Sequence, residues 1–219
     1  GTIGDITFFK SRDGYIARGK SGPTADQIAN HPAFQRTREN GQEFGRAGKA
    51  SKVLRNAIRS LLQNAADAKV VSRLTKEMMK VIKADTTSKR GLRNVIDGET
   101  ELLEGFDFNT NAKLGTTLYV SYTVVVDRVA GTLTLNIPSF KPADMIAAPA
   151  GATHFQIVSA GSEIDFEQET DTTDAHMSGI LAWDGTATAV LNEVHAVTAN
   201  STHPLLLVLG VQFFQDVNG

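Results

Sequence analysis

The chain has 219 residues, of which 41% are hydrophobic and 21% are charged, and it contains no cysteine. This composition is too apolar for a disordered chain, and no apolar run reaches the roughly eighteen residues that a membrane span needs. The lack of cysteine excludes disulfides, thiolate metal sites, iron–sulfur clusters and thiol catalysis. It leaves the compartment unknown, with an extracellular or cell-surface location favoured.

The net charge of −2 conceals an uneven distribution along the chain. Residues 1–100 carry 19 Lys and Arg against 10 Asp and Glu, whereas residues 101–219 carry 3 against 14. The first part is therefore at +9 and the second at −11. A division of this size indicates two structural units with different electrostatic roles. We predict a basic unit of hairpin and helices over 1–100 and an acidic β unit over 101–219.

Residues 3–18 are predicted to form a β-hairpin. Two β-prone runs, at 6–9 and 15–17, flank Asp13-Gly14, a pair typical of type I′ turns. An isolated hairpin is only marginally stable in water, so its apolar side chains are expected to pack on the rest of the chain or on another chain. Residues 19–25 have the composition of a linker.

Residues 32–84 are predicted to be helical. Apolar residues recur with the helical period from Val53 to Leu62 and again from Val70 to Ile82. The segment from Asn64 to Asp67 is expected to break this run. Most basic side chains fall on the opposite face of the first helix, which makes the helices amphipathic and basic.

From about residue 102 the pattern changes to period two, with recurring turn signals such as Ala160-Gly161. Strands are expected over 102–108, 117–127, 132–140, 153–159, 163–169, 177–183, 187–197 and 205–215. The segment from Leu205 to Phe214 is nearly all apolar, so we predict a central strand buried on both faces. The predicted fold class is α+β, in which the hairpin and helices precede an antiparallel β-sandwich of about seven to eight strands.

Three segments carry a resemblance to a known family: Gly1 to Asp5, Ala33 to Asn40, and Ala147 to Phe155. Together with the order of the elements, they resemble an uncharacterised Bacteroidetes-type family of small proteins, a domain of unknown function. The resemblance spans most of the chain and rests on glycines and apolar positions. It supports this architecture and a protein that is not an enzyme, and it implies no catalytic residue. It also implies that the chain continues past Asn218-Gly219.

The motifs of phosphate and calcium binding are incomplete. Gly48-Lys49 is followed by alanine, and Glu43 stands where a phosphate-binding loop needs its first glycine. Asp107 begins a segment with three calcium-ligand positions, but Ala112 and Leu118 replace the required glycine and glutamate. An Asn-rich turn explains this segment better.

Histidine spacing gives one metal-like pair. Glu193 and His195 would share a face of a strand. We interpret both as ordinary surface or core residues, and we predict no metal, no cofactor and no catalytic residue. The absence of a Gly-x-Ser-x-Gly segment also excludes a nucleophile elbow.

A dense acidic run begins at Glu163. In a strand, Glu163, Asp165, Glu167 and Glu169 would point to one face. We interpret them as a solvated acidic face. Weak cation binding, contact with a basic partner and a glycosidase-like carboxylate pair are the alternatives.

The basic helices carry enough arginine and lysine to follow a nucleic-acid backbone. No helix-turn-helix or RNA-recognition motif accompanies them, and the acidic half would repel phosphates, so we do not expect a nucleic-acid partner. A solvated helix face explains them, as does contact with the acidic β surface of this chain or of a neighbour.

These patterns favour a non-enzymatic subunit that assembles head to tail into a homo-oligomer or polymer, such as a filament, surface or particle component. The expected interface residues are Ile6, Phe8, Phe9, Tyr15, Ile16, Arg36, Arg38, Arg46, Arg55, Glu163, Asp165, Glu167 and Glu169. The alternative is a β-sandwich module that binds a glycan or another surface ligand, with Trp183, Tyr119 and Tyr122 for stacking. An enzyme is the least favoured of the three.

Overall fold

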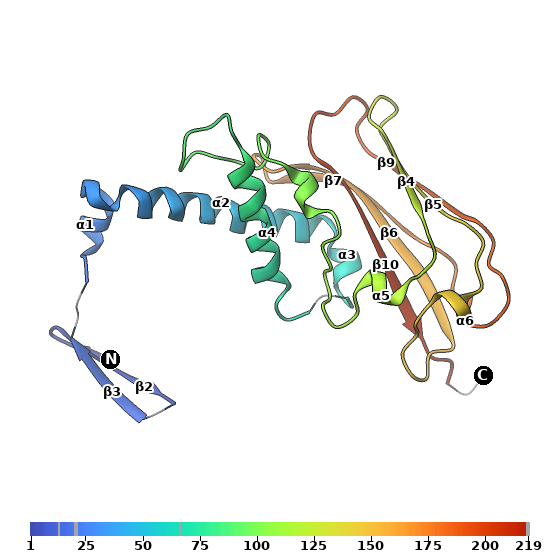
Figure 1. The fold of residues 1–219 in the computed structure, drawn as a ribbon, viewed down its shortest axis with the longest axis horizontal. Helices are drawn as coiled ribbons and strands as arrows, with labels where there is room; N and C mark the ends of the chain where they lie inside the picture. The colour runs from blue at the N-terminus through green and yellow to red at the C-terminus, as the bar shows by residue number, and fades with distance from the viewer. Residues whose placement is uncertain (13, 20–21, 66, 218–219) are drawn as a thin grey trace.

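The computed structural model describes residues 1–12, 14–19, 22–65 and 67–217. The N-terminal elements are β1 (Thr2–Ile3), β2 (Ile6–Ser11), β3 (Gly14–Gly19), α1 (Ala25–Asn30), α2 (Gln35–Ala57), α3 (Arg59–Leu62) and α4 (Val70–Ala84). The remainder contains α5 (Leu114–Thr117), β4 (Thr123–Asp127), β5 (Thr132–Ile137), α6 (Pro142–Met145), β6 (His154–Asp165), β7 (Thr170–Met177), β8 (Leu181–Ala182), β9 (Leu191–Ala196) and β10 (Leu205–Phe214). The predicted α+β class is therefore confirmed (Figure 1).

The N-terminal hairpin is confirmed and gains a short third strand. Strands β1, β2 and β3 form an antiparallel sheet in that order, which extends away from the rest of the molecule (Figure 1). Ser11 pairs with Gly14, so Gly14 is the first residue of β3 instead of the second residue of the turn. Asp13, the other half of the predicted turn, lies outside the described residues, as do Lys20 and Ser21 of the predicted linker.

Helices α2 and α4 pack against each other and onto one face of β6. The chain leaves helical structure between α3 and α4, near the predicted break, of which Ala66 lies outside the described residues. The shared apolar cluster includes Leu54, Ile58, Leu74, Met78, Ile82, Val158, Ala160 and Ile164. This cluster crosses the predicted boundary at residue 100, so the basic and acidic halves share one core.

The strands of the acidic half divide into two antiparallel sheets. One has the order β10-β6-β7, with β8 also paired to β6, and the other has the order β4-β5-β9. A second apolar cluster, which includes Leu135, Ile137, Phe155 and Ile157, joins them. We predicted a single sandwich of seven to eight strands, but the structure shows separate sheets of four and three strands, and helices pack on the first.

Strand β6 takes the place of two predicted strands. We predicted two strands, at 153–159 and 163–169, with a turn at Ala160-Gly161, but the structure has one twelve-residue strand. The strand ends at Asp165, whose side chain accepts hydrogen bonds from the backbone N–H of Glu167 and Gln168, at 2.9 and 3.0 Å. Such an Asx turn reverses the chain before the end of the predicted 163–169 strand.

Other predicted strands are shorter in the structure or absent. The segment 102–108 begins in a 3-10 turn (Thr100–Leu103) instead of a strand. Of the predicted 117–127 strand, 123–127 forms β4, and Leu118 makes an isolated bridge to Ile146. Of 177–183, Met177 ends β7 and Leu181–Ala182 forms β8, whereas β5 and β9 confirm strands within 132–140 and 187–197.

Strand β10 exists as predicted but does not lie in the centre of its sheet. It pairs with β6 along its whole length, from Leu205 opposite Glu163 to Phe214 opposite His154, and within the described residues no strand lies on its other side. Its residues are half-buried. Leu206 and Val208 pack toward the helices, whereas Leu207 and Leu209 pack toward the second cluster. The apolar run therefore reflects contact on both faces, which does not require two neighbouring strands.

Gly161 of β6 lies directly against β5 and β9 of the other sheet. A Cβ atom at this position would lie 2.5 Å from Cβ of His195 and 3.0 Å from Cδ1 of Leu133. His195 is fully buried, which lowers the pKa of its imidazole, and its Nε2 lies 3.0 Å from Oγ of Ser159. The glycine of the predicted turn thus serves close packing within a strand.

We expect Gly161→Ala to destabilise the fold by roughly 1–3 kcal/mol, because the added methyl group must displace His195 or Leu133. Urea unfolding followed by circular dichroism measures this change. Gly179→Ala is the control, since the space around Gly179 is open to 4 Å, and it should change the free energy of unfolding by less than about 0.5 kcal/mol. Equal stability of the two variants would contradict this account of the packing.

Candidate assembly surfaces

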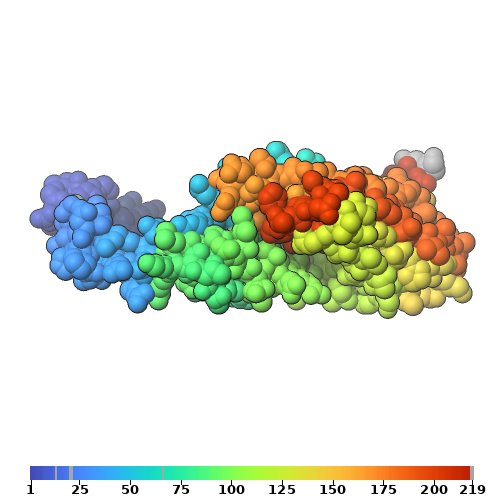
Figure 2. Space-filling view, turned by 90° about the horizontal axis from the view of Figure 1, so that it is seen from above, coloured from blue at the N-terminus to red at the C-terminus, as the bar shows by residue number. Residues whose placement is uncertain are grey.

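The first candidate surface is the N-terminal arm, defined as residues 1–19. Neither apolar cluster contains any of its residues. Tyr15 is 87% exposed and Ile3 is 75% exposed, and the other large apolar side chains, Ile6, Phe8, Phe9 and Ile16, are exposed by 39–47%. Figure 2 shows the arm and α1 at one end of an elongated molecule, with the β-rich half at the other. The structure therefore gathers the predicted apolar anchors on one small sheet, and no layer formed by the described residues covers them.

Backbone pairing and local contacts hold the arm together. The N-terminal ammonium group of Gly1 donates to the carbonyl of Phe8 at 2.8 Å, and the N–H of Phe8 donates to the carbonyl of Gly1 at 2.7 Å. The guanidinium of Arg18 lies 5.5 Å from the ring centre of Phe9. Gly4, with φ of +57°, allows the tight turn between β1 and β2. These contacts form a sheet, but they bury little of its apolar surface.

The second candidate surface is the edge of β10 that pairs with no strand among the described residues, although α5 contacts part of β10. A ten-residue strand with one unpaired edge presents a row of backbone donors and acceptors, which proteins usually protect with charge, proline or a covering segment. The sequence from Leu205 to Phe214 contains no charged residue and no proline. Hydrophobic periodicity does not reveal this edge, because it carries no information on the order of strands in a sheet.

The predicted arginines do not form one surface. Arg36 is exposed and pairs with Glu39 at 3.1 Å. Arg38 donates to the carbonyls of Ile28 and His31, which braces α1. Arg46 donates to the carbonyls of Gly91 and Arg93, and thus holds the segment after α4. Arg55 is half-buried. Of the four, only Arg36 projects fully from the surface.

Among the residues that the structure describes, one direct ion pair links the basic and acidic halves. Nζ of Lys49, on α2, lies 3.3 Å from Glu169, on the turn after β6. Contact between the basic helices and the acidic β surface of the same chain is therefore present at this position, in a pair whose two side chains are 72% and 45% exposed. Exposed pairs of this kind contribute less than about 1 kcal/mol.

The predicted acidic face is also divided. Glu163 is buried, and its carboxylate accepts hydrogen bonds from the Ser201 hydroxyl at 2.5 Å and from the Thr198 N–H at 2.9 Å. Asp165 caps the turn, whereas Glu167 and Glu169 are exposed. The prediction that all four point to one face of a strand is wrong, because β6 ends at Asp165 and Glu163 points inward.

The buried carboxylate of Glu163 is kept ionised by its partners. Burial by itself would raise its pKa, but hydrogen bonds from Ser201, Thr198 and His203 outweigh burial and lower the pKa to about 2. Nδ1 of His203 lies 3.1 Å from this carboxylate. Glu163 thus anchors the 198–203 segment to β6. Its role is to stabilise the fold, and it is not part of an assembly surface.

Comparison of the chain with protein-family models, curated proteins and solved structures gives no match. Among the described residues, every helix is too short or too polar to cross a membrane. Function must therefore be argued from the geometry of this chain alone.

We expect Glu163→Gln to lower the free energy of unfolding by roughly 1–3 kcal/mol at pH 7, because glutamine cannot replace a buried charged acceptor. A lowered pKa contributes stability above the ordinary value of 4.5 that is lost as the pH falls toward about 2. The difference in the free energy of unfolding between the wild type and Glu163→Gln should therefore shrink below about pH 4.5. Urea unfolding at a series of pH values measures it.

The exposed Glu167→Gln is the matched control, and it should be within about 0.5 kcal/mol of the wild type at every pH. A difference for Glu163→Gln that stays constant from pH 7 to pH 3 would show that its charge is not what stabilises the fold.

Proposed function

We propose that this protein is a non-enzymatic structural subunit that assembles head to tail, in which the N-terminal arm of one copy pairs with the β10 edge of the next. The observation that carries the proposal is the exposed apolar arm. A three-stranded sheet with both faces in water lacks the burial that normally stabilises such a structure. Docking on another copy would supply it.

Strand addition fits the two surfaces. The arm ends in β3, an edge strand of six residues, and β10 is an edge strand of ten residues. Pairing between them would join backbone donors to acceptors, while arm side chains such as Phe9 and Ile16 would cover apolar surface of the acceptor copy. Backbone pairing supplies affinity in this mode, and the apolar contacts set the register.

The position of the arm favours an open assembly. The arm projects from the end of the molecule opposite the C-terminal sheet (Figures 1 and 2). Each copy that donates its arm would leave its own β10 edge available, so that the contact is heterologous and can repeat into a ring or a filament. The basic arm-and-helix half and the acidic β half favour the same orientation through charge.

The alternative of a glycan-binding module receives less support. Nε1 of Trp183 donates to the carbonyl of Ile146 at 3.1 Å, and its ring packs against the second apolar cluster. This tryptophan is therefore half-buried and engaged in the fold, as expected for a residue at the end of a strand. Tyr119 and Tyr122 are exposed.

The test is the oligomeric state of the full chain and of a double variant, Phe9→Asn with Ile16→Asn, by sedimentation velocity across a range of concentrations. These two residues are cross-strand partners on the arm. We expect the wild type to form assemblies larger than a dimer at high concentration, and the variant to remain monomeric at the same concentrations.

A control variant, Val71→Asn, removes an apolar side chain of similar exposure on α4 and should assemble as the wild type does. The proposal fails if the wild type remains monomeric at high concentration in both low and high salt. It also fails if the control and the arm variant assemble equally.

A further inference from the structure

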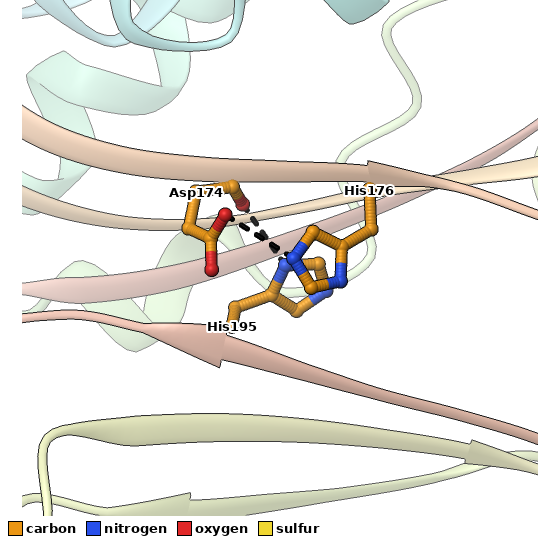
Figure 3. Close-up of side chains that lie close together, drawn as sticks. All are labelled: Asp174, His176 and His195. Carbon is orange, nitrogen blue, oxygen red and sulfur yellow. Dashed lines mark hydrogen bonds and ion pairs between the residues drawn. The ribbon is translucent and has the colours of Figure 1, made fainter.

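Three side chains from two different sheets converge near the middle of the β-rich half. Asp174 and His176 lie two residues apart on β7, and His195 lies on β9, so all three reach the same space (Figure 3). One donor atom from each lies within 4.8 Å of the other two. Oδ1 of Asp174 is 3.2 Å from Nε2 of His176. This group lies apart from the arm and from the residues of the β10 edge.

The outer atom of each side chain is held by a second group. Oδ2 of Asp174 accepts the N–H of Ala196 at 2.8 Å. Nδ1 of His176 lies 3.0 Å from Glu193. Nε2 of His195 lies 3.0 Å from the hydroxyl of Ser159. Second partners of this kind fix the orientation and tautomer of metal ligands.

The inner atoms are suitable zinc ligands. In the neutral tautomer of His176 that carries its proton on Nδ1, toward Glu193, Nε2 offers its lone pair beside Oδ1 of Asp174. Zinc bonds of about 2.0–2.1 Å in a tetrahedral site place ligand atoms about 3.3 Å apart. The 3.2 Å separation of Asp174 and His176 matches this spacing. The ligand atom of His195 lies within 4.8 Å of the other two, so its side chain would rotate to join them.

His195 can present a ligand atom without a net change of charge. Its Nδ1 lies 2.9 Å from the backbone carbonyl of Asp174, to which it donates in the metal-free network. Moving the ring proton to Nε2 would free Nδ1. The Ser159 hydroxyl accommodates both tautomers, because it can donate to a bare Nε2 or accept from Nε2–H.

We propose that Asp174, His176 and His195 bind a zinc ion that links β7 of one sheet to β9 of the other. The carboxylates of Asp174 and Glu193 supply two negative charges beside two neutral imidazoles, which balances a divalent cation. Two imidazoles and one carboxylate leave a fourth position for water. The ion would therefore act as a cross-link between the sheets that remains open to solvent.

The test is a titration of the chelator-stripped full chain with Zn²⁺ by calorimetry. We expect one ion per chain, with binding weakened more than about tenfold in His176→Gln and in Asp174→Asn. Zinc should also raise the melting temperature of the wild type and not that of these variants, because a ligand that binds only the folded state stabilises it. The side chains of His176 and Asp174 are partly exposed, so we expect both variants to fold without metal.

His154→Gln is the matched control, because His154 lies on β6 outside this group. It should bind zinc as the wild type does. The proposal is overturned if the wild type binds no zinc below millimolar concentration, or if His154→Gln and His176→Gln bind equally.

A second measurement does not depend on the variants. In the imidazole ¹⁵N spectrum of the wild type, equimolar Zn²⁺ should shift the resonances of His176 and His195 and leave those of His31 and His154 in place. Shifts confined to histidines other than His176 and His195 would assign the metal to an adventitious surface site and overturn the proposal.

Discussion

The fold depends on β6 being buried on both faces. Val158, Ala160 and Ile164 face the helices, and Phe155 and Ile157 face the second sheet. The side chains of a strand in this position must be apolar or must find hydrogen-bond partners within the protein. The strand must also contain small residues where another layer comes close. Gly161 meets the second requirement, because a side chain there would overlap His195. Strands β6 and β10 contribute to both clusters, and so the helical half and the β half share a core.

The second face of β6 also organises the buried polar groups. Ser159, Gly161 and Glu163 alternate along the strand and therefore point to the same side. Ser159 contacts His195, Gly161 leaves room for that ring, and Glu163 accepts hydrogen bonds from the 198–203 segment. One stripe of residues thus positions both β9 and the segment that leads to β10. The proposed zinc site is built on the same contact between sheets, since His195 is one of its ligands.

The arm and the β10 edge are the parts of the molecule that this core leaves without burial or backbone pairing. Within the described part of the chain, the arm has apolar side chains without a layer to cover them, and β10 has a backbone edge without a neighbouring strand. They lie toward opposite ends of the chain in space (Figure 1). Contact between copies would satisfy both at once, and for this reason the assembly proposal follows from the same packing that makes the body stable.

The sequence by itself determined the local elements: the hairpin around Gly14, the helices with their break near Asn64, and most strands of the second half. Those features depend on periodicity and turn chemistry, which act over a few residues. Only the tertiary structure decided that β10 is an edge strand, that Glu163 points inward, and that Asp174 and His176 meet His195. These outcomes depend on which distant strands lie side by side, and periodicity reports that a face is buried without identifying its neighbour.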